Sequence, residues 1–279
     1  GDRLPFANLK LSDSTYGTTA DKDGYYILRL NPGKYSVIIS YIGYNSVTIE
    51  ADVNNESIVK DILLEKNAYI TEEIQVLGED PAIEIIKNAV LYKTNFLKTL
   101  DEYNYDAYSK VIMRTNISGK DSLTPNNKFG ILGILESETK GYFKSPDMEK
   151  QIVKSKRETA NISKGFIIPL IVNFYADKID LGETKLPGII SENCFDSYEY
   201  KLKSITYQDS NKIFKIEITN KSNIVPQFYG NIYIMDSIFA LKKIDLKTNK
   251  ATDIRGIDSL RFQQKFSQYK DKNKREFWM

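Results

Sequence analysis

Short runs of alternating apolar and polar side chains fill the beginning of the chain. Tyr35, Val37 and Ile39 recur with a period of two, which predicts a half-buried strand because successive side chains of a strand point to opposite faces. The turn sequence Asn31-Pro-Gly stands directly before this strand. Further strands are predicted at residues 25–30, 47–53 and 58–64. Short strands separated by turns favour a β-sandwich, which we assign to residues 1–70.

A helical periodicity begins at Asp80-Pro81. Aspartate at the N-cap and proline at the first helical position are typical of a helix start. The apolar residues that follow are spaced by three and four positions, which predicts a helix with one apolar face that runs to about Leu100. These residues are Ala82, Ile85, Ile86, Ala89, Val90 and Leu97.

The alternation characteristic of strands returns after this helix, now in longer runs. Strands are predicted at residues 103–113, 128–143, 150–158, 198–207, 212–219, 228–235, 239–246 and 259–269. Polar connections such as residues 209–211 and 220–223 are typical of hairpins. We therefore predict a mainly β chain whose second domain, residues 71–279, is of the α+β class. In it, a helix packs on a curved antiparallel β-meander.

The composition excludes several classes of chemistry. The chain of 279 residues contains no histidine, and Cys194 is its only cysteine. Catalysis by a serine–histidine or cysteine–histidine pair is therefore impossible, as is a zinc site of the usual histidine-containing type. We expect Cys194 to be a small core residue rather than a reactive thiol. The sequence predicts no catalytic residue, no cofactor and no metal site, and hence no enzyme.

Charge and hydropathy limit the partners. The formal net charge of +2 is too small to indicate nucleic-acid binding by bulk electrostatics. Lys10, Lys34 and Lys110 are scattered, and an acid interrupts the basic run at residues 270–275. The longest apolar stretch, residues 165–175, is shorter than the roughly 18 residues that a membrane helix needs. We predict no nucleic-acid partner.

The carboxylates that come closest to a catalytic pair are Asp101-Glu102 and the pair Glu136 and Glu138. A glycosidase needs two acids facing each other in a cleft with saccharide-binding aromatic residues. The 19 tyrosines are typical of sheet faces, and the single tryptophan is Trp278. No coherent hydrolase site follows from these residues.

A group of apolar residues in the middle of the chain has two interpretations. They line or cover a cavity for a lipid or another apolar ligand, or they fill the core under the sheet, as most such clusters do. The candidate lining residues are Phe143, Phe166, Ile167, Leu170, Ile171 and Phe174. The strand order after Tyr198 also resembles, more distantly, the half-barrels of periplasmic lipoprotein carriers, in which a sheet and a helix enclose an apolar cavity.

Residues 4–44 carry the most specific motifs, from LPFANL through the turns at Asp23-Gly24 and Asn31-Pro-Gly to YIGY. They resemble the carboxypeptidase-regulatory-like (transthyretin-like) β-sandwich that opens many envelope proteins of Bacteroidetes. The zinc ligands of the metallocarboxypeptidases have no counterpart here. Such domains begin with a strand of the type G-x-V-x-D, which is not found before Leu4. We therefore expect an exposed sheet edge, open to strand exchange or to pairing with a neighbour.

A second resemblance covers most of the remaining chain. Its motifs are residues 80–90, 103–110, 136–138, 173–175, 198–202 and 228–234. In their order and spacing they are similar to a Bacteroidetes domain of unknown function that follows such a β-sandwich and usually precedes an outer-membrane β-barrel. The resemblance implies a location at the periplasmic face of the outer membrane. It implies as partner the protein's own C-terminal β-barrel or another envelope protein, and it provides no catalytic residues.

Three hypotheses about function follow. The first is a non-catalytic periplasmic part of an outer-membrane protein, which acts as a docking module and binds an apolar ligand in its second domain. The second is the N-terminal part of a TonB-dependent nutrient receptor, because residues 72–78 resemble the segment before the plug of such receptors. A capped helix and a meander follow here instead of a glycine-rich plug, so this hypothesis ranks second. A periplasmic hydrolase ranks third.

Overall fold

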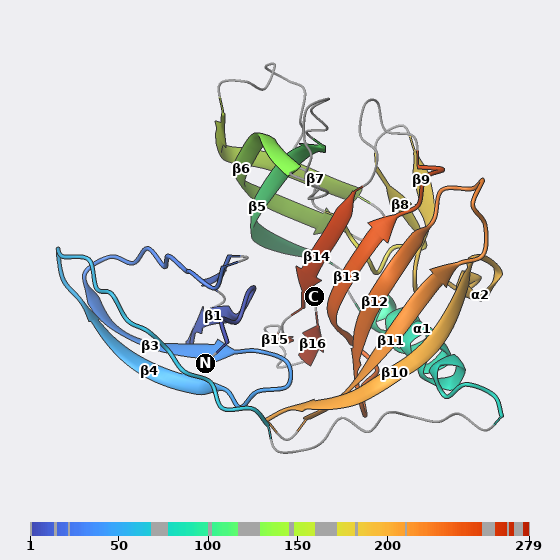
Figure 1. The fold of residues 1–279 in the computed structure, drawn as a ribbon, viewed down its shortest axis with the longest axis horizontal. Helices are drawn as coiled ribbons and strands as arrows, with labels where there is room; N and C mark the ends of the chain where they lie inside the picture. Colours follow the sequence, from blue (N-terminus) through green and yellow to red (C-terminus); the bar gives the residue numbers. More distant parts are fainter. Residues whose placement is uncertain are drawn as a thin grey trace, which may run out of the picture. The chain divides into compact units, whose positions relative to one another are not determined.

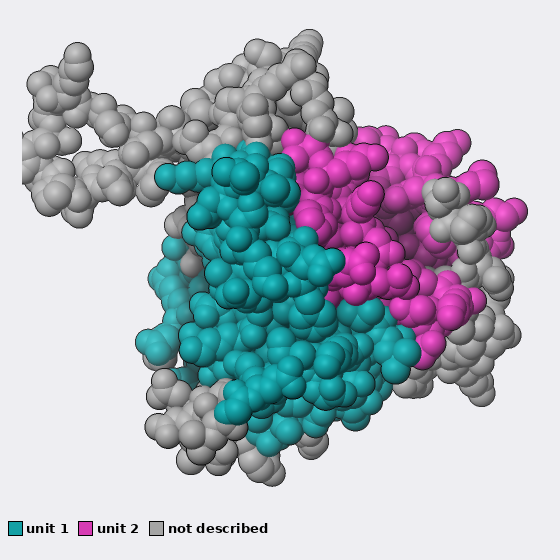
Figure 2. All heavy atoms as spheres, turned by 90° about the vertical axis from the view of Figure 1, so that its right-hand side faces the viewer, with its two compact units in different colours: residues 1–92, 195–279 teal, residues 93–194 magenta. Residues whose placement is uncertain are grey.

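The fold was obtained as a computed structural model. It describes residues 2–13, 16–21, 23–67, 78–99, 102–116, 129–144, 148–159, 172–181, 184–209, 211–252, 260–266, 268–270 and 276–278. The chain divides into two compact units, which Figure 2 colours separately. The first comprises residues 1–92 and 195–279, and the second comprises residues 93–194. The predicted boundary between residues 70 and 71 stays a prediction.

The beginning of the first unit is a four-stranded antiparallel sheet in the order β2-β1-β3-β4, of which Figure 1 labels β1, β3 and β4. Its strands are β1 (Asn8–Leu11), β2 (Gly17–Thr19), β3 (Gly33–Ser40) and β4 (Val47–Val53). Leu9 and Leu11 of β1 and Val37 and Ile39 of β3 are buried and form a common core. The period of two that predicted β3 is therefore confirmed as the burial pattern of this sheet.

The strands predicted at residues 25–30 and 58–64 are wrong, because the structure assigns no strand to either segment. Their side chains nevertheless alternate. Tyr26 and Leu28 pack against the core of the first sheet, whereas Ile27 is 70% exposed. A strand is defined by hydrogen bonds to a neighbour, and neither segment has a ladder partner among the described residues. The alternation therefore correctly indicated which side chains face the core, but it does not predict whether another strand pairs with the segment.

A five-stranded antiparallel meander forms the larger sheet of this unit, in the order β10-β11-β12-β13-β14 (Figure 1). The strands are β10 (Tyr198–Gln208), β11 (Asn211–Asn220), β12 (Phe228–Met235), β13 (Leu241–Thr248) and β14 (Arg261–Lys265). Leu202, Ile216, Ile232 and Ile244 lie opposite one another in successive strands, and all four are buried. This row belongs to the apolar face of the sheet. A two-stranded hairpin of β15 (Gln268–Lys270) and β16 (Glu276–Trp278) follows.

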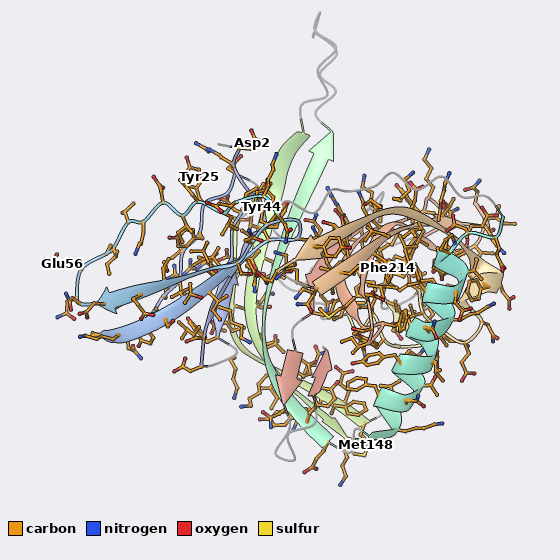
Figure 3. The ribbon with its side chains drawn as sticks, turned by 90° about the horizontal axis from the view of Figure 1, so that it is seen from below. Asp2, Tyr25, Tyr44, Glu56, Met148 and Phe214 are labelled. Atoms are coloured by element: carbon orange, nitrogen blue, oxygen red, sulfur yellow. The ribbon has the colours of Figure 1, made fainter. Side chains whose placement is uncertain are left out.

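Helix α1 (Ala82–Thr99) contacts this sheet, as Figures 1 and 3 show. The predicted cap is confirmed, because the Asp80 carboxylate accepts a hydrogen bond from the Ala82 backbone N–H at 2.9 Å. The same carboxylate oxygen accepts the backbone N–H of Leu202 in β10 at 3.1 Å. Ile86 and Ala89 on the apolar face of the helix are fully buried. Asp80 thus starts the helix and ties that start to the meander.

The second unit is built on three long antiparallel strands in the order β5-β6-β7. They are β5 (Glu102–Asn116), β6 (Phe129–Lys144) and β7 (Met148–Glu158). A small hairpin of β8 (Lys178–Asp180) and β9 (Lys185–Pro187) precedes the short helix α2 (Cys194–Ser197). Cys194 is fully buried, which confirms the expected core position. Lys93, only 2% exposed, forms an ion pair with Asp177.

Candidate functional site

The apolar residues predicted to line a ligand cavity are only partly described by the structure. Phe166, Ile167, Leu170 and Ile171 lie outside the described residues. Phe174 is buried in the second unit, with 1% of its surface exposed. Phe143 in β6 stacks on Tyr103 of β5, with ring centroids 4.9 Å apart. These contacts are those of core and sheet packing, and an apolar-ligand cavity stays a prediction.

The carboxylates weighed as a catalytic pair lie along one strand and have partners in the next. Glu136 and Glu138 are both in β6. Glu138 accepts a hydrogen bond from the Ser155 hydroxyl at 3.1 Å, and Glu136 lies 3.9 Å from the guanidinium of Arg157. Their contacts are the cross-strand pairs of a sheet. Asp101 lies outside the described residues.

The polar face of the five-stranded meander carries a row of residues that come from all five strands. The ladder places Ser204 opposite Lys215, Lys215 opposite Tyr233, Tyr233 opposite Lys243, and Lys243 opposite Lys265. We call these five residues the lysine row. Side chains alternate between the faces of a sheet, so the lysine row lies on the opposite face from the neighbouring buried row of Ile216, Ile232 and Ile244.

A cavity of about 190 Å³ lies on the lysine row, and all five residues line it. The turn after β3 contributes Tyr41 and Ile42 to the lining, and Thr206 of β10 completes it. If each water occupies about 30 Å³, the cavity has room for roughly six. The site therefore combines the side-chain amino groups of three lysines with the hydroxyl groups of serine, threonine and tyrosine.

Backbone hydrogen bonds hold the turn after β3 against the edge of the meander. Gly43 donates its N–H to the carbonyl oxygen of Tyr207 in β10 at 3.1 Å. Its φ of 87° lies in the left-handed region, where glycine adopts the turn without steric cost. Asp209, at the β10–β11 turn, accepts hydrogen bonds from the backbone N–H and the hydroxyl of Ser46 at 2.9 and 3.0 Å. These bonds fix Tyr41 and Ile42 over the row.

The lysines of the row lack carboxylate partners within the described part of the chain. No ion pair there involves Lys215, Lys243 or Lys265. The nearest acid on the same strand, Asp245, binds Arg261 through two hydrogen bonds of 2.8 and 2.7 Å. It also accepts a hydrogen bond from the Gln263 side chain at 2.9 Å. Its negative charge is therefore already matched by a neighbouring cation.

Burial makes the positive charges of this site costly. Burial first, and then the charges of Lys243 and Lys242, lower the pKa of Lys265 from 10.5 to about 7. Burial likewise lowers the pKa of Lys242 to about 8, although the nearby charge of Asp209 acts in the opposite direction. The ammonium of Lys265 donates a hydrogen bond to the carbonyl oxygen of Phe6 and lies 5.7 Å from the ring centroid of Tyr41.

The tyrosines of the site stay neutral and hence able to donate a hydrogen bond. Burial, followed by the charge of Asp245, raises the pKa of Tyr233 above its ordinary value. Burial also raises the pKa of Tyr41. Among the described residues, no hydrogen-bond partner is found for the hydroxyl groups of Ser204, Thr206 or Tyr233. The lining therefore offers hydroxyl donors beside lysines that have no carboxylate partner among the described residues, which is the chemistry of an anion site.

The first sheet presents a second feature of functional interest, in residues 25–30 and 58–64. Within the described part of the chain, no backbone N–H of residues 26–30 or 58–64 donates to another backbone group. The Tyr26 hydroxyl donates to the carbonyl oxygen of Lys60 at 2.6 Å, so a side chain bridges the two segments where no ladder does. Figure 3 shows both segments as plain traces, one near Tyr25 and the other running from Glu56.

Comparison with known protein families identifies both parts of the chain. Residues 85–279 match a family of unknown function (DUF5686). The chain belongs to this family. Residues 1–76 match the CarboxypepD_reg-like domain, which agrees with the motifs at residues 4–44. No curated protein and no solved structure matches the chain.

The family assigns no reaction, and the described residues add two observations about chemistry. They contain no group of three or more acidic, cysteine or histidine side chains placed to hold a metal ion. No helix among them is long and apolar enough to cross a membrane.

Sequence reasoning missed the lysine row for a physical reason. The row members are separated by 11, 18, 10 and 22 positions, and no periodicity connects them. Their alignment depends on the register of four hairpins and on a bulge between Leu202 and Ser204, which changes the side that later residues face. A signal was present in Lys215 and Lys243, which fall on the polar side of strongly amphipathic strands.

Proposed function

We propose that this chain is a non-catalytic docking module of a cell-envelope protein, and that its CarboxypepD_reg-like part binds one extended segment of a partner polypeptide. The observation that carries this proposal is that, among the described residues, the backbone N–H groups of residues 26–30 and 58–64 have no backbone acceptor. Extended segments with free N–H and C=O groups bind an added strand by main-chain hydrogen bonds, as in other cases of β-augmentation.

The side chains of these segments support the same function. Tyr26, Leu28 and Leu30 on one segment and Ile62 and Leu64 on the other anchor them to the core of the first sheet. Their outward neighbours include three exposed apolar side chains, with Ile27 70%, Val59 93% and Leu63 83% exposed. A strand added beside them gains about 1 kcal/mol for each hydrogen bond and also covers this apolar surface.

The succession of the two families supports a location at the periplasmic face of the outer membrane. In this proposal the partner segment belongs to the protein's own C-terminal outer-membrane β-barrel or to another envelope protein. The N–H groups of residues 26–30 and 58–64 that lack backbone acceptors support strand docking, and the family resemblance supports the compartment. An apolar ligand of the second domain remains part of the proposal on the apolar sequence of residues 165–175.

Site-specific photocrosslinking in the native envelope tests the docking function. A photoreactive benzoylphenylalanine at Val59 is expected to form a covalent product with a partner segment. The same group at Ile224, which is 89% exposed in the β11–β12 connection, serves as the control and is expected to form none. A product between two copies of the chain would identify the partner as a second copy.

A proline substitution separates strand addition from simple proximity. Leu63→Pro removes one backbone N–H that has no backbone acceptor among the described residues, so folding is little affected. If a partner strand pairs with this segment, the substitution removes one donor from the ladder. The crosslinking yield from residue 59 is then expected to fall several-fold. Equal yields at residues 59 and 224, or a yield from Val59 that Leu63→Pro leaves unchanged, would contradict the proposal.

A further inference from the structure

We propose that the cavity on the lysine row binds a phosphate group, either of a free phosphorylated molecule or of a lipid headgroup. This site lies on the meander and does not depend on strand docking at residues 25–30 and 58–64. Its ligand is anionic, which also distinguishes it from the predicted apolar-ligand cavity.

The first argument is the arrangement of like charges. Lys243 and Lys265 face each other directly across an antiparallel pair, and Lys215 lies on the same row two strands away. Like charges in opposed positions destabilise a sheet, because their Cβ atoms are only about 5 Å apart. A bound anion between the ammonium groups removes this repulsion. The arrangement is therefore unfavourable in the free protein and favourable in a complex with an anion.

The second argument is that the carboxylates near the lysine row already bind other residues. Asp245 is bound by Arg261 and Gln263, and Glu217 lies 3.3 Å from the ammonium of Lys203. Asp209 accepts hydrogen bonds from Ser46 and lies at the turn. The positive potential of the lysine row is consequently not neutralised by the described acids. A cavity lined by one sign of charge concentrates ions of the opposite sign.

The third argument is the match between the lining and the oxygens of a phosphate group. Lysine binds phosphate as a point charge, and hydroxyl donors complete the shell around the oxygens. Lys215 and Lys243 provide the charges, Lys265 provides a further amino group, and Ser204 and Tyr233 provide hydroxyl donors on the same row. A volume of about 190 Å³ admits a phosphate group together with a few waters.

Isothermal titration calorimetry with inorganic pyrophosphate is the direct test. Lys243→Met removes one charge of the lysine row and keeps the length of the side chain, and it is expected to weaken binding about tenfold or more, as for the loss of a charge-assisted hydrogen bond. Lys247→Met is the matched control. Lys247 is an exposed lysine on the same strand and the same face but outside the cavity, and its replacement is expected to change the affinity less than about twofold.

Flotation with lipid vesicles distinguishes the two sources of the phosphate group. The site is assigned to a lipid headgroup if the wild type binds vesicles of phosphatidic acid, Lys243→Met abolishes this binding, and pyrophosphate does not bind. The site is assigned to a free phosphorylated molecule if pyrophosphate binds the wild type and Lys243→Met weakens this binding. The proposal is overturned when neither probe binds the wild type, or when Lys247→Met weakens binding as much as Lys243→Met. Neither result affects the crosslinking expected at Val59.

Discussion

Replacing Lys265 with methionine is predicted to stabilise the protein at neutral pH, although removing a buried polar contact usually lowers the free energy of unfolding. The wild-type lysine has a pKa of about 7 in the fold, against 10.5 as its ordinary value. Its charged form is therefore destabilised by folding. Wild-type stability is reduced below pH 7 and rises as the pH increases from 7 to 10.5, since the unfolded chain holds the proton more tightly than the folded one.

The size of the effect follows from this pKa. Each pH unit between the folded and unfolded pKa corresponds to about 1.4 kcal/mol, so the charge of Lys265 costs at most roughly 4 kcal/mol at pH 7. Methionine removes this cost but also the hydrogen bond from the ammonium to the Phe6 carbonyl oxygen, which contributes about 1 kcal/mol. We expect Lys265→Met to raise the free energy of unfolding by about 1–3 kcal/mol at pH 7. At pH 10, where the lysine enters the fold mostly neutral, we expect less than about 1 kcal/mol.

Urea unfolding monitored by circular dichroism at pH 7 and pH 10, in buffer free of phosphate, measures this difference. Lys247→Met provides the control, because Lys247 is exposed and its replacement is expected to give a small difference that is the same at both pH values. A Lys265→Met variant that is less stable than the wild type at pH 7 would refute the reasoning. A difference that does not change between pH 7 and pH 10 would refute it equally.

Three further substitutions test how the fold is held, each by chemical unfolding against the wild type. Asp80→Ala removes the helix cap and the acceptor for an N–H of β10, and is expected to cost about 1–2 kcal/mol, whereas Asp80→Asn keeps an acceptor and is expected to cost less. Asp177→Ala removes the ion-pair partner of the buried Lys93. Because the Asp177 side chain is 62% exposed, the expected cost is about 1–2 kcal/mol, and wild-type stability would contradict this. Gly230→Ala places a Cβ 2.3 Å from the carbonyl oxygen of Asp245 at a φ of 138°, and is expected to cost at least about 2 kcal/mol, so wild-type stability would disprove that packing.

Local sequence signals determined most of the elements of the meander. The helix predicted from Asp80-Pro81 to about Leu100 is observed as α1, because cap and apolar spacing act within a few residues of one another. The strand predicted at residues 228–235 is observed with the same bounds as β12. The run predicted at residues 259–269 is interrupted at Phe266, where β14 has ended and β15 has not begun. Phe266 is buried, so its apolar side chain extends the alternating sequence pattern beyond the last hydrogen-bonded residue of β14.

Pairing between distant segments was decided only by the tertiary structure. Residues 25–30 and 58–64 carry the alternation of strands, yet no described neighbour forms a ladder with them. The lysine row is the opposite case, because no sequence periodicity connects its members, which meet through the register of five strands. The sequence by itself determined the family, the helix and the apolar faces, since these depend on neighbouring residues. The tertiary structure decided which backbone stays unpaired and which charges meet, since both depend on hydrogen bonds between residues far apart in the chain.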